Sequence, residues 1–228
     1  MSEIYSNQDL KIKTTNNIFR VELKKPNPVF LCSLKKFVKG ATCSDDYLLL
    51  TFKAYSVEML NKKKSGKSSI SMAANMVATL GGQLQELMKH SVTFLGFNPE
   101  NIIVIDSCIF LSLDIGLMSE IDEQNNVTIF TPFTSSDFFF SPQIKRATLL
   151  PLTIHCKTSY FSLGCLLLYV LLSYDDAFYQ EYLLSDSLNM EQICKKYLLN
   201  HTIKDTKLYW LIERCLVEES EKRVILFI

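Results

Sequence analysis

Polar residues interrupt an apolar run near the middle of the sequence, and this break is the first place where side chains could support chemistry. The run Phe94–Asp106 reads FLGFNPENIIVID, and its one break is the segment 98–101, Asn-Pro-Glu-Asn. A proline-containing polar segment between apolar runs is typical of a turn. Loops of this kind also carry binding and catalytic residues when a rigid scaffold positions them. The break therefore has two interpretations, a turn or the remainder of a chemical site.

A second candidate is the lysine-rich segment 61–68 (NKKKSGKS), which ends like a phosphate-binding P-loop. The P-loop pattern requires a glycine five residues before Gly66, but residue 61 is an asparagine. The preceding residues also lack the clean strand pattern that leads into a P-loop. We therefore expect residues 61–68 to form a solvated loop.

The cysteines and histidines do not have the spacing of a metal site. The seven cysteines include no C-x-x-C pair and the three histidines are scattered, so we expect no zinc site. Several cysteines, among them Cys108 and Cys165, lie in apolar runs. Free cysteines are often buried, and reduced thiols are typical of the cytosol. We therefore expect core thiols in a cytoplasmic protein.

Composition excludes several classes of function. The chain has 228 residues, 48% of them hydrophobic, which is enough for one sizeable core or for a small and a larger domain. Its 24 basic and 24 acidic residues give a formal net charge of +0, so no basic field attracts nucleic acid. The most apolar segment, Tyr160–Leu172, is shorter than the roughly 20 residues of a membrane-spanning helix. We expect a buried helix there, and neither a membrane nor a nucleic acid as partner.

The first part of the chain has the pattern of strands. Residues 1–16 are polar, and we expect a loose N-terminal arm. Apolar and charged residues then alternate over Phe19–Leu23, and two further apolar runs follow at Val29–Val38 and Tyr47–Phe52. Three short strands would form a small antiparallel sheet within residues 17–53.

The rest of the chain is mainly helical in pattern. Apolar residues recur at helical spacing over residues 70–90, with a serine at 68 or 69 to cap the helix. Residues 102–114 have the pattern of a strand pair, and residues 118–140 are expected to be irregular. Four more helices are expected at residues 158–173, 176–185, 189–199 and 205–217. Strands come first and helices later, which predicts an α+β fold.

Five segments, in order, resemble the motifs of the protein kinase superfamily. The break at 98–101 resembles the end of the kinase catalytic loop, HRDxxxxN, which often reads HRDLKPEN. After the strand pair, Leu113–Leu117 (LDIGL) is similar to the DFG motif. Three later segments resemble the APE motif, the DxWSxGC start of the central helix and the late Cys-Leu…Arg signature: residues 140–143 (FSPQ), 160–165 (YFSLGC) and 214–223 (RCL…R). The resemblance implies a bilobal kinase-like fold, with a reduced N-lobe at 17–53 and a helical C-lobe at 54–228.

The resemblance also implies a cofactor site. In kinases the catalytic-loop Asn and the DFG Asp hold Mg²⁺ on the phosphates of ATP, and these positions are Asn101 and Asp114 here. The kinase lysine that contacts the phosphates corresponds to Lys24, because Val21–Lys24 (VELK) is similar to VAIK. Other interpretations stay open: Asn101 and Asp114 could only hold a loop and cap a turn, and Lys24 could be a surface lysine before a proline.

Residues that kinases need for catalysis are missing. The base of the HRD triplet corresponds to Gly96, which has no side chain to accept a proton. Phe94, Leu95 and Asn98 occupy the positions of the His, the Arg and the following Lys, so we expect no catalytic residue in this degenerate loop. The sequence has no Gly-rich loop, and no glutamate occurs in residues 23–57 to pair with a phosphate-binding lysine.

Other departures concern the scaffold. The span from Lys24 to Leu50 is shorter than a helix and two strands would need. Ser159 replaces the Asp that braces the HRD arginine, and Gln143 replaces the APE Glu, which leaves a neutral amide facing Arg223. Residues 127–137 hold several hydroxyls in the position of the activation segment, and we expect an ordinary polar loop there.

These departures favour a pseudokinase, which is a kinase-like scaffold or regulator that binds another protein, such as a true kinase or its substrate. The alternative within the family is a divergent, active serine/threonine kinase that uses Asn101 and Asp114 with Mg-ATP. A third class, a helical interaction protein unrelated to kinases, would leave the ordered motifs unexplained.

Overall fold

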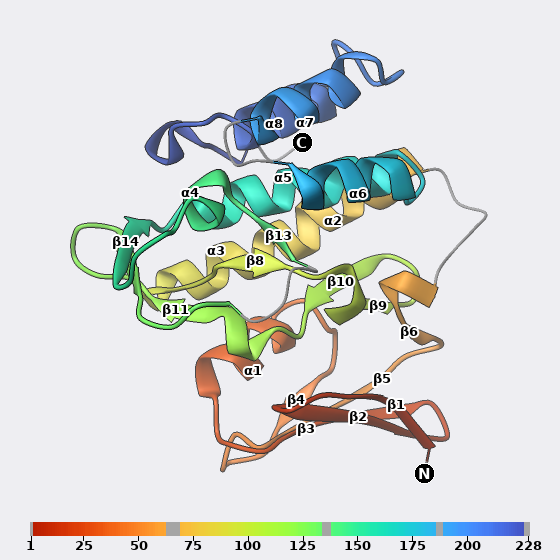
Figure 1. The fold of residues 1–228 in the computed structure, drawn as a ribbon. Coiled ribbons are helices and arrows are strands. Elements are labelled where there is room, and N and C mark those ends of the chain that lie inside the picture. Colours follow the sequence, from red (N-terminus) through yellow and green to blue (C-terminus); the bar gives the residue numbers. More distant parts are fainter. Residues whose placement is uncertain (1, 63–68, 134–137, 186–188, 226–228) are drawn as a thin grey trace.

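The computed structural model describes residues 2–62, 69–133, 138–185 and 189–225, and it has an α+β fold (Figure 1). A five-stranded antiparallel sheet lies at one end of the molecule, and the later helices lie at the other. The strand order is β1-β2-β3-β5-β4. The strands are Ser2–Ser6 (β1), Leu10–Thr15 (β2), Ile18–Leu23 (β3), Thr42–Cys43 (β4) and Leu49–Lys53 (β5).

The N-terminal residues belong to this sheet, so the prediction of a loose arm at residues 1–16 was wrong. Strand β2 pairs with β1 on one side and with β3 on the other. Leu10 and Ile12 are fully buried, whereas Lys11 is exposed and Lys13 is half-buried. Two alternating apolar residues are sufficient here, because only one face of an antiparallel sheet has to cover a core.

The apolar run Val29–Val38, predicted to be a strand, is instead mostly helix α1 (Pro28–Lys35). The side chain of Asn27 caps this helix by accepting a hydrogen bond from the N–H of Phe30 at 2.9 Å. Proline at the first helical position and asparagine before it are a typical helix start. The span from Lys24 to Leu50 holds this eight-residue helix, the two-residue strand β4 and only the start of β5, which agrees with the expectation that a full helix and two strands do not fit there.

A helical segment through the centre of the molecule confirms the helix predicted over residues 70–90. Helix α2 (Ser69–Met76) continues through a π-helical turn, η2 (Val77–Gly81), into α3 (Gly82–Lys89). The buried side chain of Gln83 accepts from the N–H of Ser112 at 2.8 Å and donates to its carbonyl at 3.1 Å. Of the predicted loop at 61–68, residues 63–68 lie outside the described residues.

A three-stranded sheet next to this helix contains the strand pair that was predicted at residues 102–114. Strand β9 (Ile102–Ile105) pairs with β10 (Ile109–Ser112) on one side and with β6 (Val57–Met59) on the other. Single 3-10 turns join several elements: Leu60–Lys62 (η1), Pro99–Asn101 (η3), Ile115–Leu117 (η4) and Ser220–Lys222 (η5).

The region 118–140, expected to be irregular, contains three short strands. Each pairs antiparallel with a strand outside the region: β11 (Met118–Glu120) with β7 (Val92–Phe94), β12 (Asn126–Ile129) with β14 (Leu152–His155), and β13 (Phe139–Phe140) with β8 (Gly96–Phe97). Each ladder is two to four residue pairs long, which leaves too short an alternation to read from the sequence. Residues 134–137 of the predicted polar loop are not among those described.

Helices make up most of the C-terminal part, close to where they were predicted. They are α4 (Pro142–Lys145), α5 (Thr158–Leu171), α6 (Asp176–Leu184), α7 (Met190–Leu199) and α8 (Lys207–Cys215). Helix α5 is buried along almost its whole length, as predicted for Tyr160–Leu172. It contacts α8 closely at Gly164, where a Cβ would lie 2.9 Å from Cβ of Cys215. Within the described ranges, no helix is both long and apolar enough to cross a membrane.

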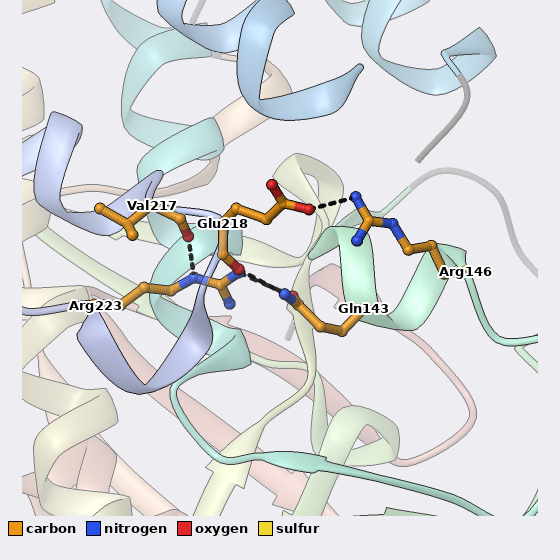
Figure 2. Close-up of polar contacts among 5 residues, drawn as sticks. All are labelled: Gln143, Arg146, Val217, Glu218 and Arg223. Atoms are coloured by element: carbon orange, nitrogen blue, oxygen red, sulfur yellow. Dashed lines mark hydrogen bonds and ion pairs between the residues drawn. The ribbon is translucent and has the colours of Figure 1, made fainter. Parts of the chain in front are cut away.

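A fully buried arginine ties the chain end to α4 (Figure 2). The guanidinium of Arg223 donates to Oε1 of Gln143 at 2.9 Å, and to the carbonyls of Val217 at 2.7 Å and Glu218 at 2.8 Å. The contact between Gln143 and Arg223 is the one the sequence predicted. Arg146, also on this side of the molecule, pairs with the carboxylate of Glu218 at 2.8 Å. Burial lowers the pKa of Arg223 to about 10, because desolvation disfavours the charged guanidinium.

The seven cysteines are free thiols. Cys165 is fully buried, and its Sγ lies 3.7 Å from that of Cys194. Burial raises the pKa of the Cys165 thiol well above its ordinary value, so it is an unreactive core thiol, as expected. Cys108 is exposed near the turn between β9 and β10, so the expectation of a core position was wrong for this residue.

Candidate functional site

The two residues predicted to bind a metal ion lie in direct contact. Nδ2 of Asn101 donates a hydrogen bond to Oδ1 of Asp114. The β9–β10 hairpin brings them together, since Ile102 and Ser112 are paired across it. The N–H of Leu113 donates to the carbonyl of Asn101 at 2.9 Å and closes the base of the hairpin. The sequence therefore placed this pair correctly, because a hairpin returns its ends to the same place.

Asp114 is a buried acid. Its exposed fraction is 5%, and burial raises its pKa from 3.8 to about 7. Hydrogen bonds oppose this shift in part, from the Asn101 amide and from the N–H of Asn98, which lies 3.4 Å from Oδ2. Among the described residues that shift this pKa there is no cation, and the hydrogen bonds to the carboxylate come from neutral donors.

Tyr5 of strand β1, near the start of the sequence, also contacts Asn101. Its hydroxyl donates to Oδ1 of Asn101 at 2.6 Å and accepts from Nδ2 of Asn7 at 3.0 Å. Desolvation raises the pKa of Tyr5 to about 12, which keeps the hydroxyl protonated as a donor. The amide of Asn101 is thereby engaged at both ends, its nitrogen by Asp114 and its oxygen by Tyr5.

The turn between β1 and β2 covers the same place. Its residues Asn7, Gln8 and Asp9 line a cavity of about 480 Å³ together with Asn101, Asp114 and their neighbours. The turn is held by the side chain of Asn7, which accepts from the N–H groups of Asp9 at 2.8 Å and Leu10 at 2.9 Å. Asp9 also contributes to raising the pKa of Asp114, so two acids face this cavity. A phosphate group here would meet negative charge.

The segment 94–98, which resembles a degenerate catalytic loop, is occupied with packing and a helix cap. Phe94 and Leu95 are buried in apolar clusters, and the side chain of Asn98 caps η3 by accepting from the N–H of Glu100 at 2.8 Å. Gly96 is buried in β8, where a Cβ would lie 2.7 Å from the ring of Phe140. The position that corresponds to the kinase base is therefore filled by a neighbouring aromatic ring.

Lys24 does not join this site. It follows β3, its side chain is exposed, and its backbone N–H donates to the carbonyl of Asp9 at 2.9 Å. Among the described contacts, none links its ammonium to Asn101 or Asp114. Helix α1, the first helix after it, contains no acidic residue to pair with it.

As they are arranged, Asn101 and Asp114 leave one side-chain oxygen without a short hydrogen bond for Mg²⁺, Oδ2 of Asp114, which lies 3.4 Å from the N–H of Asn98. A magnesium ion takes oxygen ligands, but Oδ1 of Asn101 is bonded to Tyr5 and Oδ1 of Asp114 to the amide nitrogen of Asn101. In the part of the chain that is described, no group of three or more His, Cys, Asp or Glu side chains is placed to hold a metal ion.

Tyr5, Asn7 and Asp9 were not predicted as site residues. They lie in the stretch interpreted as an arm, and Tyr5 is 96 residues away from its partner Asn101. The strand alternation of Leu10 and Ile12 was the one signal that could have placed this stretch in the sheet.

Comparisons with known proteins do not assign the chain to a family. No protein-family model matches the sequence, and a search of curated proteins finds no match. The function therefore has to be argued from the site.

Proposed function

We propose that this chain is a protein kinase-like domain that has lost phosphotransfer and acts in the cytoplasm by binding another protein, either a kinase or the substrate of one. In this proposal, the β1–β5 sheet with helix α1 is a reduced N-lobe, and residues 54–228, which contain helices α2 to α8, are the C-lobe. The order of elements supports it: strands and one helix, a long helix, a polar loop, a strand hairpin, and a buried central helix.

The closed contact between Tyr5, Asn101 and Asp114 carries the proposal. In a working kinase, the two positions that correspond to Asn101 and Asp114 direct oxygens at Mg²⁺ and the nucleotide phosphates. Here their polar atoms bond to each other and to Tyr5, and the β1–β2 turn covers them with Asp9. This arrangement favours a site whose polar atoms are engaged by the chain itself, at the edge of the cavity that they line.

Two further observations support the loss of chemistry. Gly96 replaces the base, and Phe140 packs against it, so no proton acceptor can stand at that position without rearrangement. Lys24 is exposed and has no helical acid to orient it. General-base catalysis alone is typically worth about 10²–10⁴ in rate.

The contact between Gln143 and Arg223 supports the kinase-like assignment. These residues lie 80 positions apart, and a hydrogen bond joins them at 2.9 Å. The motif alignment predicted this pair because the APE Glu and the late Arg bond in kinases. An unrelated helical protein would have no reason to place them together.

One observation favours the second candidate, a divergent active kinase: Asn101 and Asp114 lie in contact, as two ligands of one metal ion would. A phosphotransfer assay with radiolabelled ATP, Mg²⁺ and a generic protein substrate separates the two. We expect the wild-type chain and the Asp114→Ala variant to give the same background signal. Phosphotransfer by the wild type that Asp114→Ala abolishes would overturn the proposal in favour of an active enzyme.

A further inference from the structure

A pocket of about 430 Å³ lies beside the segment 98–101 and has three tyrosines in its lining, Tyr169, Tyr174 and Tyr179. Its other lining residues come from η1 and from the 98–101 segment: Asn61, Asn98, Pro99 and Glu100. The pocket shares none of these residues with the cavity at Asp114. It is therefore a separate place on the molecule.

The tyrosine rings are fixed by one another. The ring centroid of Tyr169 lies 5.4 Å from that of Tyr174 and 5.4 Å from that of Tyr179. The buried ring of Phe139 lies behind this group, 5.7 Å from Tyr169 and 5.4 Å from Tyr179. Aromatic rings at these separations pack favourably, so the pocket has an ordered aromatic wall before any ligand arrives.

The backbone at Tyr174 is held in an uncommon conformation. Ser173 and Tyr174 have φ angles of 56° and 64°, in the left-handed region, and the N–H of Tyr174 donates to the carbonyl of Tyr169 at 3.0 Å. A bulky residue with positive φ is an outlier that costs free energy. The strained residue Tyr174 lines the pocket, and neither position 173 nor position 174 is a glycine, which would adopt this conformation without the cost.

The described lining of the pocket carries one charge, which is negative. Glu100 is exposed and part of the lining. After desolvation, the charge of Asp176 is the next cause that raises the pKa of Tyr169. The described lining contains no lysine, arginine or histidine. Because the faces of aromatic rings also carry negative potential, a positive charge is the complement of this pocket.

We propose that this pocket binds a weakly hydrated organic cation on a side chain of a partner protein, the guanidinium of an arginine or the ammonium of a methylated lysine. Both cations lose less hydration than a plain ammonium when they contact aromatic rings. Glu100 supplies the opposite charge, and the pocket is within the size range of small-ligand sites. The inference rests on the proposed function for one point, that the cation belongs to a protein.

A ligand-observed NMR titration of the full chain tests this site. The probes are capped Gly-X-Gly tripeptides in which X is arginine, trimethyllysine, lysine or citrulline, the neutral isostere of arginine. We expect saturable binding of the arginine or the trimethyllysine peptide, tighter than that of lysine, and none of citrulline. The stronger of the first two identifies the source of the cation. Equal binding of citrulline and arginine, or no saturable binding of either cation, would overturn the proposal.

Matched variants locate the binding. Glu100→Gln and Tyr174→Leu should each weaken it by between about twofold and thirtyfold, as expected for the loss of one charge or one aromatic face. Tyr174→Phe keeps the ring and should bind normally, since the Tyr174 hydroxyl is buried without a hydrogen-bond partner among the described residues. Tyr55→Leu is the control, because Tyr55 is 93% exposed and not part of the pocket. Unchanged affinity in both Glu100→Gln and Tyr174→Leu would refute the assignment.

The two proposals fail separately. Phosphotransfer activity would contradict the loss of chemistry and leave the cation pocket standing. If no cation binds, the proposed ligand of the pocket is wrong, and the proposed loss of phosphotransfer at Asn101 and Asp114 is unaffected.

Discussion

Replacing Gly96 by aspartate would restore the residue that kinases use as a base, yet we predict a loss of stability and no phosphotransfer. Gly96 lies in β8 and pairs with Phe140 of β13. A Cβ at this position would lie 2.7 Å from Cδ1 of the Phe140 ring and 3.1 Å from the carbonyl oxygen of Phe139. Both distances are shorter than ordinary van der Waals contact, so the ring or the strand pair has to move.

Two costs add in this variant. Extra atoms in a packed core cost about 1–3 kcal/mol, and a buried polar group without partners costs about 1–3 kcal/mol more, with a larger cost for a charge. We expect the free energy of unfolding to fall by about 3–5 kcal/mol, which lowers the melting temperature of a chain of this size by about 6–20 °C. Gly96→Ala adds the steric cost alone and should lose about 1–3 kcal/mol.

Urea denaturation of the wild type, Gly96→Ala and Gly96→Asp, followed by circular dichroism, measures these differences. The order of midpoints should be wild type, then alanine, then aspartate. A Gly96→Asp variant as stable as the wild type would refute the packing argument. Phosphate transfer by Gly96→Asp would contradict the proposal, because it would show that the chain binds ATP and that only the base was missing.

Three further changes test the site and the scaffold. Tyr5→Phe removes the hydrogen bond to Asn101 and should lower the free energy of unfolding by about 1 kcal/mol in urea denaturation; no change would mean that this bond does not hold the β1–β2 hairpin. Because the pKa of Asp114 is about 7 in the folded state and 3.8 ordinarily, folding favours its protonated form. Its contribution to stability is fully present below about pH 4 and is lost as pH rises through about 7, at up to about 1.4 kcal/mol per pH unit. The stability difference between wild type and Asp114→Asn, measured from pH 4 to 8, should shift against the wild type by this slope, and a pH-independent difference would contradict a raised pKa. Gln143→Glu gives the Arg223 guanidinium a carboxylate, but it removes the hydrogen bond that Nε2 of Gln143 donates to the carbonyl of Glu218 at 2.6 Å and turns a second oxygen toward that carbonyl. We expect the free energy of unfolding to fall by about 1 kcal/mol; a higher urea midpoint would mean that the charge-assisted bond to Arg223 dominates.

Long periodic segments and short-range hairpins were predictable from the sequence. The apolar spacing over residues 70–90 and the uniformly apolar Tyr160–Leu172 each led to a helix close to the observed one. The strand pair at 102–114 placed Asn101 beside Asp114, because the register of a tight hairpin fixes what lies at its base.

Short and long-range features were not predictable in the same way. The run Val29–Val38 is short enough to be read as strand or helix, and the Asn27-Pro28 start signal was the better guide. The pairing of β8 with β13 and the bond from Tyr5 to Asn101 join residues far apart in the sequence. No local pattern encodes such contacts, so the contact of Tyr5 with Asn101 is visible only in three dimensions.

The central proposal, that the chain's own side chains occupy the position where a kinase would hold its nucleotide, is tested most directly by a thermal-shift titration with ATP in the presence and absence of Mg²⁺. A ligand at about 100 times its dissociation constant would stabilise the fold by about 2.7 kcal/mol, and about 5–10 °C in melting temperature for a chain of this size. We predict no change in melting temperature with ATP, with or without Mg²⁺. A shift that requires Mg²⁺ and disappears in Asp114→Ala would contradict the account, because it would show that Asn101 and Asp114 open to hold the metal and its nucleotide.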